Sequence, residues 1–259
     1  MIAEHVGKAL QGCSWVGIPF CGGLSEVPHI DARTIVCNDL HKHILNLARV
    51  AADPRLGPAL YRRLRRLILH PQTLAYAQGV CREIGSIPTE SEMLDWAENY
   101  FVCAWMARNG TAGTKNEFKA GLSFRWEAGG GDSATRYRNA VGSLLAWRRT
   151  LARCTFTCLD VFEFLKNCKD ETGLGLYADA PWPSDGDCYA HKFSEADQRQ
   201  LATKLSAYCR TRVVVRFGVH PLIRELYPES AWDWRRVSGR TSANNPKAEV
   251  LLVRNAPPG

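Results

Sequence analysis

Six short apolar runs constrain the fold of this chain most. They are rich in β-branched and aromatic residues, and segments with apolar residues at helical spacing follow several of them. The runs cover residues 14–20, 33–39, 152–160, 174–179, 212–218 and 247–255. Strands that alternate with helices are typical of a parallel sheet with helices on both faces. We therefore predict an α/β fold with a mostly parallel, Rossmann-like sheet.

The helices that go with this sheet are expected at residues 41–52, 161–168, 194–209 and 220–227, with Ser194 as an N-cap. Between the second and third runs the pattern changes to helices at 55–70 and 91–107 and loops at 108–139, where Gly, Thr, Ser and Asn are frequent. A length of 259 residues suits a core domain with an insertion. We predict a sheet domain from residues 1–52 and 151–259 and a helical and loop insert from 53–150.

Positive charge is concentrated in this insert. The chain has a net charge of +7, and residues 101–150 hold eight Lys and Arg against three Asp and Glu, which gives +5. Such charge in a loop-rich insert is typical of nucleic-acid binding, and we expect double-stranded DNA as the partner. Arg125, Arg136 and Arg138 are the candidates for base or phosphate contact. Trp126 and Tyr137 could stack on bases or pack inside the insert.

Acidic residues follow three of the predicted strands, namely Asp39, Asp160 and Asp179. In parallel sheets, ligands bind beyond the carboxyl ends of the strands. The Gly22-Gly23 turn after the first strand lets backbone approach a ligand, and an acid after the second strand can accept ribose hydroxyls. The turn does not match G-x-G-x-x-G, which counts against phosphate-bearing nucleotides. The pattern indicates a nucleoside-containing cofactor, although Asp39 and Asp160 could instead cap the helices that follow.

The order of these segments resembles the Dam-type adenine-specific DNA methyltransferases over nearly the whole chain. "IPFCGG" (18–23) is similar to their Pro-Phe-x-Gly turn, and "CNDLHKHILNL" (37–47) is similar to their Asp-Ile-Asn segment. "CLDVFEFL" (158–165) resembles the strand end that meets the cofactor's adenine, and "DAPW" (179–182) stands where the family has Asp-Pro-Pro-Tyr. "ARNGTAGTKNEF" (107–118) is similar to their recognition segment, and "KAEVLLVRN" to their last strand.

The resemblance implies a class I methyltransferase sheet, S-adenosylmethionine as cofactor, and methyl transfer to the N6 amine of adenine in DNA. The residues that it implies for cofactor binding are Pro19, Phe20, Cys21, Gly22, Gly23, Asp39, Leu40, Asp160, Val161 and Asp179. Those that it implies near the target base or along the DNA are Tyr189, Phe193 and, in the recognition segment, Asn109. His191 is a further candidate because it lies between Tyr189 and Phe193, and Arg125, Arg136 and Arg138 are candidates from the charge of the insert.

The catalytic assignment falls on "DAPW". An exocyclic amine is a poor nucleophile, and acceptors for its two hydrogens help it to pyramidalise, so that transfer is a matter of positioning and electrostatics. In this assignment the Asp179 carboxylate and the Ala180 carbonyl accept those hydrogens, and Pro181 stiffens the turn. Trp182 is expected at the mouth of the site, where an everted base can stack on it.

Three departures from the family keep alternatives open. Ala180 replaces the usual second-position proline, and Leu24 stands where many members have a glycine. The family has an aromatic-Gly-Gly-Lys segment just before its first helix. Residues 1–12 resemble that helix, so either the true start lies upstream or cofactor binding is weakened. These departures suit a degenerate DNA-binding protein. "DAPW" also does not separate adenine in DNA from cytosine N4 or from adenine in RNA.

Other classes of function are disfavoured. The ten cysteines contain no C-x-x-C, which favours reduced structural thiols and no metal site. No apolar run is as long as a membrane span, and the N-terminal residues lack the apolar core of a signal peptide. We expect a cytoplasmic protein without a membrane partner, as a monomer or weak dimer. A role in restriction-modification or in a phage or other mobile element stays open.

Overall fold

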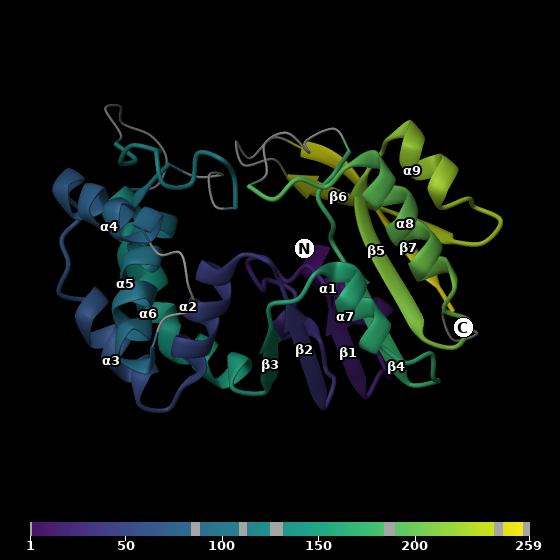
Figure 1. Cartoon of the computed structure of the whole chain (residues 1–259), viewed down its shortest axis with the longest axis horizontal. Helices are drawn as coiled ribbons and strands as arrows, with labels where there is room; N and C mark the ends of the chain where they lie inside the picture. The colour runs from purple at the N-terminus through teal and green to yellow at the C-terminus, as the bar shows by residue number, and fades with distance from the viewer. Residues whose placement is uncertain are drawn as a thin grey trace. The chain divides into compact units, whose positions relative to one another are not determined.

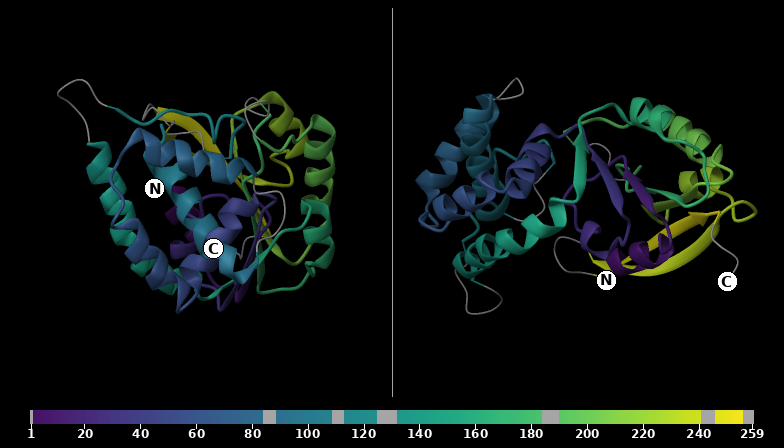
Figure 2. Two further views of the ribbon diagram at one scale, coloured as in Figure 1. Left: turned by 60° about the vertical axis from the view of Figure 1, so that its left-hand side comes forward. Right: turned by 90° about the horizontal axis from the view of Figure 1, so that it is seen from below.

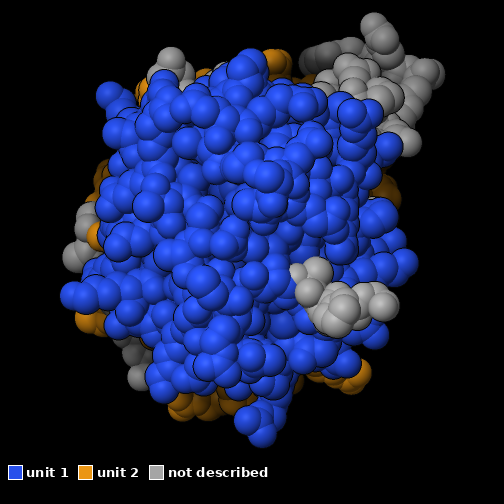
Figure 3. Space-filling view, turned by 90° about the vertical axis from the view of Figure 1, so that its right-hand side faces the viewer, with its two compact units in different colours: residues 1–40, 153–259 blue, residues 41–152 orange. Residues whose placement is uncertain are grey.

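Two stretches of chain that lie far apart in the sequence form one sheet. The computed structural model describes residues 2–83, 89–108, 113–124, 132–183, 190–240 and 246–255, and the chain divides into two compact units. Unit 1 consists of Met1–Leu40 and Arg153–Gly259, and unit 2 of His41–Ala152 (Figure 3). The seven strands of the sheet are β1 (Trp15–Ile18), β2 (Thr34–Asn38), β3 (Cys154–Thr157), β4 (Leu174–Ala178), β5 (Arg212–Gly218), β6 (Asp233–Arg240) and β7 (Pro246–Arg254) (Figure 1).

The strand order is β3-β2-β1-β4-β5-β7-β6, with β1 to β5 parallel and β7 antiparallel to both of its neighbours. This order differs from the 3-2-1-4-5-6 order of doubly wound nucleotide-binding sheets only by the insertion of β7. The direction of winding reverses between β1 and β4, and in such sheets ligands bind beyond the carboxyl ends at this point. The predicted Rossmann-like, mostly parallel α/β fold is confirmed.

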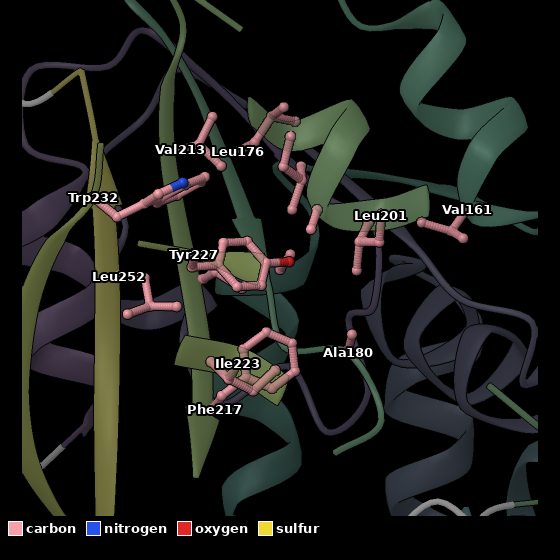
Figure 4. Close-up of a cluster of buried hydrophobic side chains, with 14 of the residues drawn as sticks. Val161, Leu176, Ala180, Leu201, Val213, Phe217, Ile223, Tyr227, Trp232 and Leu252 are labelled. Atoms are coloured by element: carbon pink, nitrogen blue, oxygen red, sulfur yellow. The ribbon is translucent and has the colours of Figure 1, made fainter. Parts of the chain in front are cut away.

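One face of the sheet is covered by α7 (Val161–Asn167), α8 (Glu195–Ser206) and α9 (Pro221–Leu226) (Figure 2). Alternate strand residues point into this layer because side chains alternate between the faces of a strand. Leu176, Val213, Phe217 and Leu252 come from the sheet and Leu201 from α8. Figure 4 shows these side chains packed around Tyr227 and Trp232, whose rings meet edge to face at 5.0 Å between centroids.

The first helix, α1 (Ile2–Ala9), packs on the opposite face together with the short 3-10 helix η1 (Val27–His29). The packing is close, because a Cβ added at Gly175 in β4 would lie 2.8 Å from Cδ2 of Leu10. Arg212 of β5 holds the end of this segment by donating to the carbonyl oxygens of Ala9 and Gln11, at 3.2 and 2.5 Å.

Unit 2 is helical. Its helices are α2 (Lys42–Ala52), α3 (Leu56–Leu64), α4 (Pro71–Glu83), α5 (Glu90–Met106) and α6 (Ser133–Leu151). The predicted boundary at residue 52 assigns α2 to the sheet domain, whereas α2 packs on α3, α5 and α6 and falls in unit 2. The apolar face of α2 explains this placement, because Leu45, Ala48 and Ala51 are buried there.

Several boundaries differ from the prediction. Residues 133–139 were expected in a loop, but they begin α6, because the Asp132 side chain accepts from the backbone N–H groups of Ala134 and Thr135 and caps the helix. The prediction omitted β6 because its sequence, "DWRRVSGR", is rich in charged residues. In the structure β6 pairs with β7 along its length. The predicted cap at Ser194 is confirmed, in a capping box with Asp197.

A buried polar and aromatic cluster ties α2 to α5 and to residues 113–118 in unit 2. Nε2 of His41 and Oε2 of Glu117 are 2.6 Å apart, and the Tyr100 hydroxyl donates to Oε1 of Glu117 at 2.9 Å. His43 stacks on Tyr100 and accepts from Nε1 of Trp96. Burial pushes the pKa of Glu117 up, but the contact with His41 and the hydrogen bonds from Gly113 and Tyr100 together outweigh it and leave that pKa below its ordinary value.

The cluster predicts a loss of stability on acidification. Burial lowers the pKa of His43 to about 4, whereas an unfolded histidine has a pKa of about 6.5. Between these values the unfolded chain binds the proton and the folded chain does not, so stability falls as the pH falls from about 6.5 to about 4, by about 2–3 kcal/mol. Chemical denaturation followed by tryptophan fluorescence at several pH values measures this slope.

His43→Gln should flatten the slope over that window, and the exposed His5→Gln should leave it unchanged. The lowered pKa of Glu117 adds a further loss of stability as the pH falls below about 4.3, which both variants keep. An equal slope between pH 6.5 and 4 in wild type and His43→Gln would contradict the assignment.

Candidate active site

The side-chain amide of Asn38 holds the carboxyl ends of three strands together. Asn38 is the last residue of β2, and its Nδ2 donates to the carbonyl oxygens of Pro19 after β1 and Leu159 after β3, at 3.1 and 2.9 Å. Its Oδ1 accepts from the Thr157 hydroxyl and from the Leu159 backbone N–H, both at 2.9 Å. This side chain therefore fixes the positions from which the predicted site residues after β1, β2 and β3 start.

The glycine turn and the first predicted acid lie against each other at this edge. The backbone N–H of Gly22 donates to Oδ2 of Asp39 at 2.8 Å. Gly22 has a φ of +43°, which a glycine tolerates best, and a Cβ added at Gly22 or Gly23 would meet no atom of the described residues within 4 Å. His41, and not Asp39, is the N-cap of α2. Asp39 thus faces an open turn.

Leu24 has a φ of 60°, in the left-handed region that favours glycine. The departure from the family at this position therefore carries a backbone cost, on the order of 1 kcal/mol. Its side chain is buried, and its N–H donates to the Cys21 carbonyl at 2.9 Å, which closes the turn. The turn forms despite the missing glycine.

Asp160 has the capping role that the sequence left open. Its Oδ1 accepts from the Phe162 backbone N–H at 2.8 Å, and it is the N-cap of α7. The neighbouring Val161 is in the hydrophobic core beneath α7. Leu40, beside Asp39, has an exposed apolar side chain. A cofactor role for Asp160 remains a prediction.

Asp179 follows β4 and is paired with Arg216 of β5. Nη1 of Arg216 is 2.9 Å from Oδ2 of Asp179, and Nε of the same guanidinium is 2.8 Å from Oε2 of Glu249 in β7. Glu26, just before η1, lies 3.8 Å from Nη1. Three carboxylates from three segments of unit 1 thus surround one arginine, which the sequence analysis did not anticipate.

The Asp179 carboxyl is 27% exposed and has an unusual pKa. Partial burial raises this pKa to about 6, and the negative charge of Glu26 adds to the effect while the positive charge of Arg216 opposes it. Asp179 is therefore ionised at neutral pH but close to its titration point. Perturbed acids of this kind are frequent at functional sites.

The side chain of Trp182, expected at the mouth of the site, is buried in the structure. Its side chain is 8% exposed and packs against β5, where a Cβ added at Gly218 would lie 2.8 Å from the indole ring. Nε1 of Trp182 donates to Oδ1 of Asp179 at 3.3 Å, and the Arg216 guanidinium lies 6.0 Å from the ring centroid. The indole packs where Gly218 has no side chain, and from there its N–H holds the Asp179 carboxylate.

The rest of "DAPW" is held in place as well. Ala180 is buried in the core, and the Pro181 carbonyl accepts from Nε2 of Gln198 in α8 at 2.5 Å. Phe193, expected near the target base, meets Phe20 of the first turn edge to face at 5.6 Å between centroids. His191 is exposed. Tyr189 lies outside the described residues.

The unit 2 candidates have mixed outcomes. Nη2 of Arg136 donates to the carbonyl oxygens of Trp105 and Ala107, at 2.9 and 3.1 Å, so its guanidinium is engaged within the unit. Tyr137 is buried and donates to the Leu64 carbonyl at 3.1 Å, so the packing alternative is correct for it. Arg138 is exposed. Asn109, Arg125 and Trp126 lie outside the described residues.

The net charge of the chain is located entirely in unit 2. Its sequence, residues 41–152, contains sixteen Lys and Arg against nine Asp and Glu, a balance of +7, whereas unit 1 has seventeen of each. One of the nine acids, Glu117, is buried against His41. The surface of unit 2 is therefore strongly basic, while unit 1 is electrically balanced.

Sequence reasoning missed Asn38, Arg216, Glu249 and Glu26. Arg216 did leave a signal, because Arg212 and Arg216 interrupt the apolar run "RVVVRFG" on the same strand face. A charge inside a central strand must find a partner, since burying it alone is costly. Glu249, within "KAEVLLV", is the matching acid. It pairs with Gly218 at the end of the β5–β7 ladder, two positions from Leu251, the partner of Arg216.

No family model matches the chain, and no curated protein matches it. Among solved structures it is similar to SMU.472, described as "a putative methyltransferase complexed with SAH", with a TM-score of 0.29 and 10% identity. The similarity covers 77% of this chain, which spans 56% of that one. In the described part of the chain, no helix is long and apolar enough to cross a membrane.

The role of Asn38 predicts that Asn38→Asp destabilises unit 1. A carboxylate cannot donate to the carbonyl oxygens of Pro19 and Leu159, which would lose their partner, at a cost of about 2–4 kcal/mol. Asn167→Asp, which removes a single exposed bond to the Glu163 carbonyl, should cost less than about 0.5 kcal/mol. Equal unfolding midpoints in urea for the two variants would contradict this role.

Proposed function

We propose that the chain is an S-adenosylmethionine-dependent DNA methyltransferase that acts on the N6 amine of adenine. The observation that carries this proposal is the position of Asp179 just beyond β4, at the switch point of the sheet. The neighbouring strand β1 leads into the glycine turn, where the Gly22 N–H donates to Asp39. The order of motifs resembles the Dam-type enzymes. The strand order of unit 1 agrees with the fold which that resemblance implies.

The residues at this edge suit S-adenosylmethionine. The open space beside Gly22 and Gly23 would take the cofactor close to the backbone, and Asp39 would accept a ribose hydroxyl. When bound, the cofactor supplies an electrophilic methyl group on a positively charged sulfur. The carboxylates of Glu26, Asp39 and Asp179 favour a cationic ligand without phosphates at this edge.

Asp179 would act on the methyl acceptor. Its ionised carboxylate accepts a hydrogen of the target amine and so favours the nitrogen lone pair that attacks, as the resemblance implies for this position. The carbonyl of Ala180 would be the second acceptor. Since Trp182 is buried, Trp182 would position Asp179 by its indole N–H rather than stack on the base. Phe20 and Phe193, in edge-to-face contact, are the described aromatics that would line the base site.

Unit 2 would bind the DNA. Its balance of +7 suits the phosphate backbone of a duplex, and exposed arginines such as Arg62, Arg65, Arg66 and Arg138 would supply contacts that weaken with added salt. Arg136 would have a structural role in unit 2 instead, because its hydrogen bonds to the carbonyls of Trp105 and Ala107 join α6 to the end of α5.

A second candidate is a DNA-binding protein without catalysis. The engagement of both Asp179 oxygens, by Arg216 and by Trp182, favours it, together with the left-handed Leu24. The two candidates agree on the partner of unit 2 and differ on whether unit 1 transfers a methyl group. Cytosine N4 and adenine in RNA are further acceptors for the same chemistry.

The test is methyl transfer by the purified protein from radiolabelled S-adenosylmethionine to duplex DNA, single-stranded DNA and RNA, followed by nucleoside analysis. We expect N6-methyladenine in DNA. Asp179→Asn should lower the transfer rate by about 100-fold or more, because an uncharged amide is a poorer acceptor for the amine. Its affinity for S-adenosylmethionine, measured by calorimetry, should change little. Glu229→Gln, an exposed acid on unit 1, serves as the control.

Each outcome separates the candidates. Binding to duplex DNA without binding of S-adenosylmethionine would overturn the enzyme and favour the inactive DNA-binding protein. Methylated cytosine or methylated RNA would keep the chemistry and correct the acceptor. Equal loss of cofactor affinity and of transfer in Asp179→Asn would give Asp179 a cofactor-binding role in place of the catalytic one.

A further inference from the structure

Arg216 is the centre of a charge network on the α1 face of the sheet. Its strand alternates sharply, since Val213, Val215 and Phe217 enter the core with α7 to α9 while Arg216 points to the other face. On that face it meets Glu249, which is opposite Gly218 in the β5–β7 pairing. A charged side chain at this depth is retained only with partners, and here it has carboxylates on two edges of its guanidinium.

The geometry of the guanidinium is defined at both ends. Nε bonds to the buried Glu249 at 2.8 Å, and Nη1 bonds to Asp179 at 2.9 Å. Glu249 is 2% exposed, so that it has little freedom to move and fixes the plane of the arginine. Trp182 lies beside the guanidinium and donates to the other oxygen of Asp179. The chain of contacts runs from β7 through β5 to the loop after β4.

We propose that Arg216 is the positioning residue of Asp179, and that Glu249 in turn holds Arg216, so that an arginine between two acids aims the carboxylate at the methyl acceptor. This inference rests on the proposed function for the identity of the acceptor. The arrangement around Asp179 can be tested without it.

Arg216 has two effects in this arrangement. It holds Oδ2 of Asp179. The orientation of this carboxylate is therefore set by strand β5, which carries Arg216, and not by the loop after β4 alone. It also keeps the carboxylate ionised against its surroundings. The groups that face Asp179 are Glu26 before η1, Tyr177 of β4, Glu249 of β7 and Arg216, and Arg216 alone among these four is a cation.

The experiment is a titration of the Asp179 carboxyl by NMR on protein with ¹³C-labelled aspartate, with the signal assigned by its loss in Asp179→Asn. Wild type should titrate near pH 6. Arg216→Met should raise the midpoint by about one pH unit or more, since an opposite charge is removed, whereas Arg216→Lys should keep it near the wild-type value. Glu249→Gln removes a like charge and should move the midpoint downward.

A second arginine of β5 provides the matched control. Arg212 points to the same face, and its guanidinium donates to the backbone carbonyls of Ala9 and Gln11. Arg212→Met should therefore lower the melting temperature and leave the Asp179 midpoint unchanged. A purely structural Arg216 would behave in the same way, and an unchanged midpoint in Arg216→Met would overturn the proposal.

Methyl transfer is the second measurement. The acidic limb of its pH profile should follow the NMR midpoint. Arg216→Met should therefore be slower than wild type at pH 7, by about twofold for a midpoint one pH unit higher and by about tenfold for one two units higher, and it should recover in part at higher pH. If Arg216→Met does not fold, the Asp179 midpoints of Arg216→Lys and Glu249→Gln test the role of Arg216. The first should stay near the wild-type value and the second should be lower. If wild type methylates no acceptor, the proposed function fails, while the NMR titration still decides the role of Arg216.

Discussion

The side-chain amide of Asn38 is the contact on which the geometry of the site depends. Parallel strands give a sheet its edge, but the loops that leave this edge have no ladder of their own. By using two donors and two acceptor contacts, Asn38 joins the exits of β1, β2 and β3 in one network. The Gly22 turn and Asp39 then start from fixed points, and their mutual hydrogen bond follows.

Much of the sheet could be predicted from the sequence because its strands coincide with apolar runs that are rich in β-branched residues. The cap at Ser194 could also be predicted from a local pattern, since a serine three residues before an acid forms a capping box. The strand β6 was not, because "DWRRVSGR" is polar and is recruited by its partner β7. The start of α6 was hidden in a run of loop-forming residues, where the cap at Asp132 overrode composition.

The candidate site was predicted in its positions more than in its chemistry. Asp39 and Asp179 could be placed at strand ends because the ends of apolar runs are visible in the sequence. The partners of Asp179 were not visible, since Glu26, Arg216 and Glu249 are far apart in the chain and meet only through the strand order. The burial of Trp182 could not be predicted for the same reason, because its indole packs against Gly218, on another strand.

The contact between Gly218 and Trp182 links two distant positions in the history of this protein. Any side chain at position 218 would enter the space of the indole, with a first clash at 2.8 Å. An alanine at position 218 would require a displaced indole or a smaller residue at position 182, and a smaller residue would lose the indole donor to Asp179. Positions 182 and 218 should therefore co-vary in an alignment of relatives, as a glycine with tryptophan or as a larger residue with a smaller one.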